Sequence, residues 1–178
     1  VAYWYIGSLW GCGIIYDNTA DMVNNYVVPA NPRVDVIEYA IRDLEYAAKN
    51  LPASQTGAGR VTKYAAFGML SRVYLSMAGL TTSGQYNGSN VQTNFNSGQR
   101  NPYYLDLAKK AAAKVINESN AALMSSYADL FKASTIDNNS ESLFQLQFQP
   151  GTGIGGLGNS MSRFLAWSTM VADQNAWG

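Results

Sequence analysis

The sequence predicts a mainly α-helical fold, built from antiparallel helical hairpins with long irregular loops and little β-strand. Several long segments repeat apolar residues at steps of three and four, which is the spacing of one helix face. Two of these segments open at an Asn-Pro pair, at 31–32 and 101–102; Asn can cap a helix and Pro is tolerated in its first turn. Only residues 141–149 alternate apolar and polar side chains with the period of a strand.

The chain is expected to begin with the end of a helix, residues 3–10, which the run Gly-Cys-Gly at 11–13 would terminate. Residues 14–32 are rich in Asn, Asp and Pro and predict a loop. The chain starts at Val1 and stops without a closing element, so we expect an internal fragment of a longer protein, with residues 1–178 forming a single helical domain.

The single cysteine, Cys12, has two interpretations. Residues 9–12 (LWGC) resemble a lipoprotein cleavage box, but no basic residue precedes them, and Trp10 is bulky where a small residue is required. The preferred interpretation is a small buried thiol.

The helix predicted at 32–50 has an apolar stripe with alternating steps of three and four, which is a narrow seam for a partner helix. The stripe consists of Val34, Ile37, Ile41, Leu44, Ala48 and Leu51. The charged residues of this helix are mostly off the seam and predict a solvated face. They are Asp35, Glu38, Arg42, Asp43, Glu45 and Lys49. The pair Leu51-Pro52 would end the helix, because the residue before proline disfavours helical backbone angles.

The helix predicted at 59–79 (GRVTKYAAFGMLSRVYLSMAG) is the element around which the others are expected to pack. Apolar and small residues nearly encircle it, so it should be buried on most sides. Ala65, Ala66 and Gly68 are small enough to let a neighbouring helix approach closely. With the helix at 32–50 it should form an antiparallel hairpin, and the pattern of small residues and Tyr is similar to tetratricopeptide units, although the full repeat signature is absent.

The second half of the chain predicts one more long helix. Residues 79–101 predict a long polar loop. A loop of this length indicates a functional role or local disorder. The helix at 102–119 would face the core with Tyr104, Ala108, Ala111, Ala112, Val115 and Ile116. A short helix at 126–131, the strand at 141–149, a glycine-rich loop at 150–160 and a short helix at 161–170 complete the prediction.

The composition narrows the classes of function. Twelve Lys and Arg balance twelve Asp and Glu, whereas nucleic-acid binders usually carry a basic surplus. Charged residues are only 13% of the chain, and neutral polar and aromatic residues replace them, which suits neutral polar ligands such as sugars. The absence of histidine removes the commonest general base and metal ligand, so no catalytic residue, metal site or cofactor is predicted.

Three local patterns are weak. The G-x-G-x-x-G at 151–156 lacks the alternating strands and helices that a dinucleotide site needs. The oxygen-bearing run Asp137–Glu141 lacks calcium-loop spacing and predicts a polar turn. Asp17 with Asp21, or Asp173 alone, gives no facing pair of carboxylates for glycoside cleavage, so the chain is not predicted to be an enzyme.

A sugar site requires flat aromatic faces and hydrogen-bonding side chains. The last thirty residues offer both, and the predicted ligand-binding residues are Asn159, Arg163, Trp167, Asp173, Asn175 and Trp177. A second candidate set is Trp10, Tyr16, Asp17, Asn18 and Tyr26. A third, weaker set is Tyr86, Asn87 and Asn90 in the long loop. The alternative for each aromatic residue is packing on the scaffold.

Residues 34–52 (VDVIEYAIRDLEYAAKNLP), the following GRVTK at 59–63 with Ala65-Ala66, and ESLF at 141–144 occur together and in this order. This arrangement resembles the SusD/RagB family of outer-membrane nutrient-binding lipoproteins, over roughly residues 30–149. The resemblance implies a tetratricopeptide-like scaffold whose irregular loops hold a glycan or another nutrient. It also implies an N-terminal lipid anchor outside this chain, a cell-surface location and a TonB-dependent SusC-like transporter as partner.

The function expected from the resemblance is non-catalytic binding of glycans for delivery to that transporter. The matched motifs belong to the scaffold, so no site residue is carried over from the family. The alternative is a helical-repeat scaffold that binds only protein.

Overall fold

The computed structural model describes residues 1–23, 27–57, 59–93, 98–132 and 139–145. The chain divides into two units, Val1–Phe144 and Gln145–Gly178, and nearly all described residues belong to the first. The described residues form four α-helices and one two-stranded sheet, which confirms the mainly helical prediction. None of the described helices is both long and apolar enough to span a bilayer. The single domain over residues 1–178 stays a prediction.

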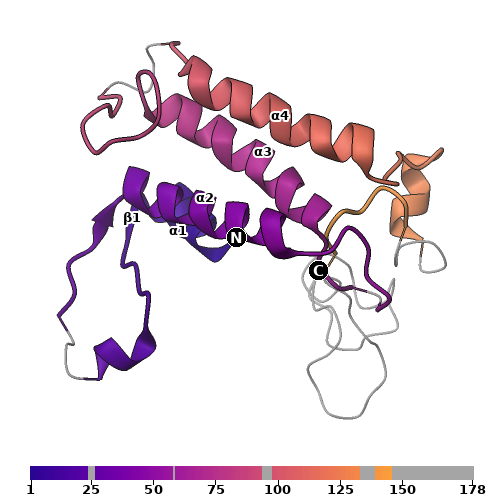
Figure 1. Cartoon of the computed structure of the whole chain (residues 1–178), viewed down its shortest axis with the longest axis horizontal. Coiled ribbons are helices and arrows are strands. Elements are labelled where there is room, and N and C mark those ends of the chain that lie inside the picture. The colour runs from indigo at the N-terminus through magenta and orange to yellow at the C-terminus, as the bar shows by residue number, and fades with distance from the viewer. Residues whose placement is uncertain (24–26, 58, 94–97, 133–138, 146–178) are drawn as a thin grey trace, which may run out of the picture. The chain divides into compact units, whose positions relative to one another are not determined.

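Three helices form the core of the first unit: α2 (Arg33–Asn50), α3 (Lys63–Leu80) and α4 (Pro102–Glu118). Helix α3 packs against both of the others, and each neighbour runs antiparallel to it (Figure 1). The predicted hairpin of stacked antiparallel helices is therefore confirmed. The buried core is aliphatic and aromatic: Val34, Ile37, Ile41, Leu44, Ala48, Ala66, Leu70, Val73, Tyr74, Met77, Ala78, Leu80, Tyr104, Ala108 and Ala111.

Helix α3 begins four residues later than predicted, because Gly59 has a positive φ of 72° and cannot be part of a helix. Thr62 caps the helix by accepting a 3.4 Å hydrogen bond from the Ala65 amide. The space above Gly68 is filled by a loop rather than by a helix: a Cβ there would lie 2.8 Å from Leu143 Cδ1. The prediction that small residues let a neighbouring helix approach is therefore wrong at Gly68. Elsewhere α3 does contact helices, namely α2 and α4.

The two Asn-Pro pairs behave differently. Asn101 caps α4 as predicted, because its side chain accepts a 3.0 Å hydrogen bond from the Tyr103 amide. Asn31 does not cap α2; its Oδ1 accepts from the Ile15 amide at 3.3 Å instead. The pair 31–32 forms strand β2 (Asn31–Pro32), which is antiparallel to β1 (Cys12–Gly13).

Helix α1 (Ala2–Trp10) packs against α2 and ends at Gly11, whose φ of 75° is left-handed. Gly7 permits this approach, since a Cβ at that position would lie 2.8 Å from Ile37 Cδ1. The contact explains why Val36 and Ala40 are buried although they lie outside the predicted stripe of α2. This helix therefore has two buried faces rather than one narrow seam.

Four further predictions were wrong, or wrong over their described part. Ile116 is 77% exposed, because it is turned away from the helix face that Tyr104, Ala108 and Ala111 bury. Cys12 is exposed on the short strand β1 rather than buried. The predicted short helix at 126–131 is a 3₁₀ turn, η3 (Tyr127–Phe131), and residues 14–32 contain another, η1 (Thr19–Met22).

The fourth is the strand predicted at 141–149. Residues 141–145 are not a strand; the Glu141 carboxylate accepts a 2.9 Å hydrogen bond from the Met124 amide, and Phe144 is 54% exposed. Residues 146–149, the glycine-rich loop at 150–160 and the predicted helix at 161–170 lie outside the described residues.

Candidate functional site

An open pocket lies at the end of the helical stack where α2 and α4 begin and α1 and α3 end. Its volume is about 510 Å³, within the range of roughly 300–1,000 Å³ that is usual for small-molecule sites. The apolar walls are Ile37, Leu75, Leu80 and Leu105, and the polar lining is Ser8, Arg33, Ser76, Gly79 and Arg100. We call it the end pocket. It combines aliphatic surface with two guanidinium groups and contains no acidic lining residue.

Two glycines make room for the two arginines of the end pocket. A Cβ on Gly11 would lie 2.9 Å from Arg33 Nη2, and a Cβ on Gly79 would lie 3.0 Å from Arg100 Nη1. Each guanidinium therefore lies directly on a glycine backbone. A larger side chain at either position would have to displace the arginine.

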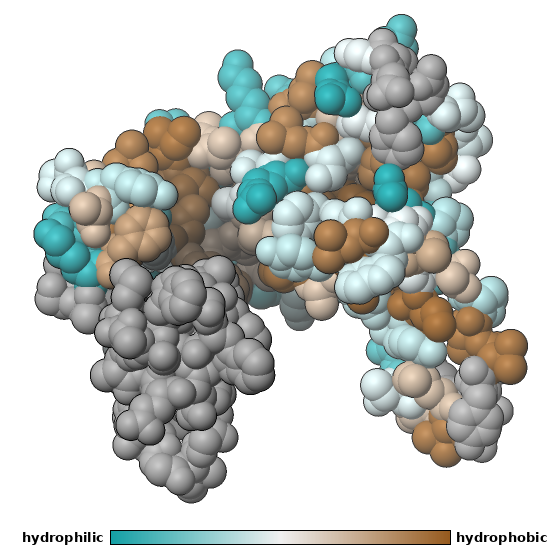
Figure 2. All heavy atoms as spheres, turned by 180° about the vertical axis from the view of Figure 1, so that it is seen from behind, coloured by the Kyte–Doolittle hydropathy of each residue, from teal (hydrophilic) through white to brown (hydrophobic). Residues whose placement is uncertain are grey.

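A second cavity of about 180 Å³ lies between the end of α2 and the start of α3. Its lining has no polar surface: Val1, Leu44, Ala47, Leu51, Val61, Ala65, Ala66, Met69 and Phe144. Figure 2 shows that hydrophobic side chains are exposed on the face it draws, including around a hollow. This small apolar cavity offers no hydrogen-bonding group to orient a sugar hydroxyl.

The acidic residues of α2 accept hydrogen bonds from tyrosines of other elements. Tyr74 on α3 donates to Glu45 at 2.6 Å, and Tyr86 in the loop after α3 donates to Asp35. Tyr104 on α4 donates to Glu38 over a longer 3.4 Å. The predicted solvated face is therefore partly an interface, which joins α2 to α3, to α4 and to the loop.

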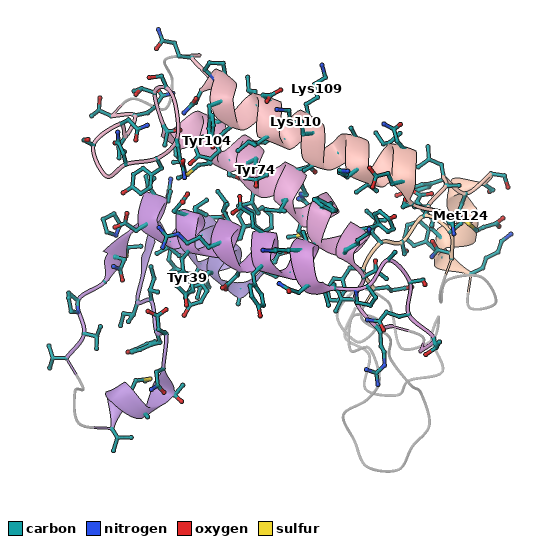
Figure 3. The ribbon with its side chains drawn as sticks, in the orientation of Figure 1. Tyr39, Tyr74, Tyr104, Lys109, Lys110 and Met124 are labelled. Atoms are coloured by element: carbon teal, nitrogen blue, oxygen red, sulfur yellow. The ribbon has the colours of Figure 1, made fainter. Side chains whose placement is uncertain are left out.

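The tyrosine hydroxyls become weaker acids through these contacts. Burial, reinforced by the Asp35 carboxylate, raises the pKa of Tyr86 to about 12, and burial raises the pKa of Tyr104 to about 12. Burial and the bond to Glu45 raise the pKa of Tyr74 further. Burial also raises the pKa of the Glu38 carboxyl, although the nearby Arg42 opposes that shift. Figure 3 shows Tyr74 and Tyr104 at the contact of α3 with α4, whereas Lys109 projects away from the core.

No family model matches the chain. A SusD-like protein of Bacteroides ovatus is 36% identical over 182 residues, which cover 99% of this chain and 29% of that protein. Two solved structures are 36% identical, with TM-scores of 0.77; the matches cover 94% and 96% of this chain and 30% and 31% of theirs. One of them is a crystal structure with xylogluco-oligosaccharide.

This chain is homologous to a SusD-like protein. The resemblance expected from the sequence is thereby confirmed, and the matching structures share the helical fold over nearly all of the chain. The chain spans less than a third of the length of these relatives.

The residues predicted to bind ligand all lie outside the described residues. They are Asn159, Arg163, Trp167, Asp173, Asn175 and Trp177. Their role stays a prediction.

The second candidate set is described except for Tyr26, and most of its polar atoms have structural partners. The Asp17 carboxylate accepts a 2.5 Å hydrogen bond from Tyr39, and the Asn18 side chain caps η1. The Tyr16 backbone exchanges hydrogen bonds with the Tyr3 hydroxyl. Trp10 differs, because it is 70% exposed at the end of α1 and keeps an open aromatic face. None of the described residues of this set lines either cavity described above.

The third candidate set stabilises the loop after α3. Asn90 Nδ2 donates to the carbonyls of Ser83 and Gln85, and Asn87 Oδ1 accepts from the amides of Ser89 and Asn90. With Tyr86 bonded to Asp35, these side chains use their polar groups to hold residues 82–90 in one conformation. The described part of the long loop is therefore ordered rather than loose.

The described chain holds no cluster of three or more His, Cys, Asp or Glu side chains arranged for a metal ion. Within the weak oxygen-bearing run, Asn139 Oδ1 accepts from the amides of Glu141 and Ser142, as a polar turn would. Asp137 and Asn138 lie outside the described residues.

Sequence reasoning missed the end pocket, although a signal was present. Arg33 directly follows one Asn-Pro pair and Arg100 directly precedes the other. Since α2 and α4 both run antiparallel to α3, their first residues lie at the same end of the stack. The two helix starts therefore bring the two arginines into one pocket.

Proposed function

We propose that the chain takes part in non-catalytic binding of glycans or oligosaccharides at the cell surface. The observation that carries this proposal is the homologous structure with xylogluco-oligosaccharide, at 36% identity and a TM-score of 0.77. A helical scaffold held together by buried side chains, with aromatic residues such as Trp10 left exposed, is compatible with this role.

The proposal includes delivery of the ligand to a TonB-dependent SusC-like transporter, with anchoring in the outer membrane through an N-terminal lipid. The resemblance to the SusD/RagB family and the SusD-like relative support both parts. No group with a catalytic role is proposed, and the ligand should leave the protein chemically unchanged.

The direct test is isothermal titration of the full chain with xylogluco-oligosaccharide, beside an unbranched cello-oligosaccharide of the same backbone length. Saturable binding, with the oligosaccharide recovered intact by chromatography, is the expected result. Release of shorter sugars would overturn the non-catalytic role. Failure to bind any saccharide, together with capture of a protein partner other than the transporter, would favour the protein-only scaffold.

Delivery requires a separate experiment. Purification of a tagged chain from native membranes should recover a TonB-dependent transporter in stoichiometric amount. Recovery of the chain without a transporter would contradict this part of the proposal and leave the binding result in place.

A further inference from the structure

Helix α3 has one face that is open to solvent between α1 and α4. Arg72 and Leu75 are exposed on it, and Ser76 and Gly79 are half-buried. These residues are three or four positions apart, so they lie on the same side of the helix. Leu75, the large apolar residue of this face, is 53% exposed. The face therefore has an apolar centre beside two small residues that let another element approach closely.

The neighbouring helices form the sides of this face. Trp4 of α1 lies against it, since its indole Nε1 donates a 3.3 Å hydrogen bond to Ser76 Oγ. Ser8 of α1 and Leu105 of α4 line the end pocket together with residues of α3, so the end pocket is the deep end of this open face. We call the whole surface the α3 groove. It consists of Trp4, Ser8, Arg72, Leu75, Ser76, Gly79 and Leu105, with Arg100 at its deep end.

The rim of the groove on α1 continues the apolar surface. Trp4 and Ser8 are one turn apart on the side of α1 that meets α3, and Tyr5 and Leu9 follow them around the helix. Tyr5 is 51% exposed and Leu9 is 69% exposed. Helix α1 contains no charged residue, and a helix that is apolar on its outer side is usually covered by another element or by a partner. The groove and its rim are therefore typical of a protein-binding surface.

Two cations mark the α3 groove, and neither has an ion pair within the described part of the chain. The ion pairs found there belong to Arg42, Lys110, Lys114 and Lys132. The Arg72 guanidinium lies 5.2 Å from the ring centre of Trp4, a contact that leaves its charge uncompensated. Arg100 lies over Gly79, since a Cβ there would be 3.0 Å from Arg100 Nη1. Arg33, at the same end, already has an interaction partner, so the charge available to a second molecule is that of Arg72 and Arg100.

The spacing of the two cations defines what can pair with both. Arg72 and Gly79, over which Arg100 lies, are seven residues apart on α3, which is about 10 Å along a helix. Two acidic residues seven positions apart on a second helix would have the same separation on one side of it. The apolar residues of such a helix recur at steps of three and four and would meet Leu75 and Leu105. A sugar fits less well, because the floor and the α4 wall are aliphatic and offer no flat aromatic face.

We propose that the α3 groove binds an amphipathic, acidic helix of a partner protein. The apolar side of that helix packs on Leu75 and Leu105, and two acidic residues about two turns apart pair with Arg72 and Arg100. The proposal does not depend on glycan binding, because it uses no residue that is predicted to bind a sugar.

The test is fluorescence anisotropy of a labelled synthetic helical peptide that is titrated with the full chain. The peptide carries Leu at steps of three and four, and two Glu seven positions apart on the same side. One control peptide has Lys in place of both Glu, and another is a scrambled sequence of the same composition. The Glu peptide should bind saturably, and both controls should bind at least tenfold more weakly. Equal binding of the three peptides, or binding of none, would overturn the proposal.

A reversal of charge locates the binding in the groove. Arg100→Glu should lower the affinity for the Glu peptide about tenfold or more and raise the affinity for the Lys peptide, because the charge that faces the ligand changes sign. Leu75→Glu replaces an exposed residue, so the chain should fold, and binding of the Glu peptide should be abolished. Lys49→Met removes an exposed cation of α2 outside the groove and is the matched control. An unchanged preference between the peptides in Arg100→Glu, or an equal loss in Lys49→Met, would overturn the assignment.

Two further measurements separate other occupants of the groove. Sedimentation of the chain should show a monomer at the concentrations used, and a dimer that Leu75→Glu dissociates would assign the groove to a second copy and overturn the proposal. Added xylogluco-oligosaccharide should leave the peptide bound, and displacement of the peptide would assign the groove to a sugar and overturn the proposal as well. A failure of peptide binding leaves the result of the glycan titration in place.

Discussion

The hydroxyl of Tyr74 donates a 2.6 Å hydrogen bond to Glu45 Oε1, and this bond joins the middle of α3 to the second half of α2. Tyr74 is buried while Glu45 is exposed, so the carboxylate reaches over the edge of the core to meet the ring. Similar bonds from Tyr86 and Tyr104 make α2 the common acceptor of three tyrosines.

Replacement of Tyr74 by Phe should destabilise the chain by about 1–2 kcal/mol, because it removes one hydrogen bond to a charged acceptor that is partly solvated. Urea unfolding followed by circular dichroism measures the change. Tyr46→Phe is the matched control, since Tyr46 is exposed on α2, next to Glu45, and its hydroxyl has no hydrogen bond in the described part of the chain. Equal stability of the two variants would contradict the role of the Tyr74–Glu45 bond.

Alkaline pH should destabilise the fold through its tyrosines. The pKa values of Tyr86 and Tyr104 are raised to about 12 in the folded state, against an ordinary value of 10.0. A raised pKa means that the folded state retains the proton, so this contribution is fully present below pH 10 and is lost as the pH rises from about 10 to 12. Thermal unfolding at intervals from pH 9 to 12 should show the decline. In Tyr86→Phe the decline should be shallower, and an identical profile would count against the assignment.

Asn101 should be much more important to stability than Asn31, although both precede proline. The buried Asn101 side chain caps α4 and donates to Thr81 Oγ1 and the Gly84 carbonyl, both at 2.8 Å. Asn101→Ala should cost about 2–4 kcal/mol, since it removes a cap and leaves buried polar groups without a partner. Asn31→Ala should cost about 1 kcal/mol or less, and chemical denaturation of both variants tests the difference. The reverse order would be incompatible with this account.

Leu70→Asp should prevent folding, because Leu70 is 2% exposed in the core and its replacement buries an unpaired charge. The comparison is Leu75→Asp, which lies on the same helix at an exposed position and should remain folded. Far-ultraviolet circular dichroism separates the two outcomes. A cooperative thermal transition in Leu70→Asp would show that the core differs from the one described.

The predicted glycan-binding residues can be tested by Trp167→Ala and Trp177→Ala. If the rings stack on a sugar, each change should weaken binding by about 1–3 kcal/mol, by analogy with aromatic stacking on nucleic-acid bases. Titration with xylogluco-oligosaccharide provides the measurement, and Trp10→Ala tests the second candidate set in the same assay. Unchanged affinity in both tail variants would remove that segment from the site.

The helical framework could be predicted from the sequence because its apolar spacing is local. Every residue of the predicted α2 stripe from Val34 to Ala48 is buried, and the antiparallel hairpin is as expected. The second buried face of α2 was missed, since Val36 and Ala40 face α1, whose approach depends on one glycine, Gly7. Such a contact has no periodic signature in the sequence of α2 itself.

The candidate sites were harder to predict, because polar side chains in a sequence do not reveal their partners. Asp35 and Glu45 read as solvated charges, yet tyrosines from 29 and 51 positions away in the chain donate to them. Asn87 and Asn90 read as ligand-binding amides, yet they bind their own backbone. Arg33 and Arg100 line one pocket because α2 and α4 run in the same direction. Each Asn-Pro pair predicts the start of one helix and says nothing of how the two helices are oriented.

The hydrogen bonds made by Asn87 and Asn90 have a thermodynamic consequence. Residues 82–90 lose their conformational freedom when the chain folds, and not when a second molecule arrives. A surface that is already ordered can meet another molecule without a further loss of backbone conformational entropy, which lowers the cost of association there. The amide side chains of this segment therefore make its backbone rigid.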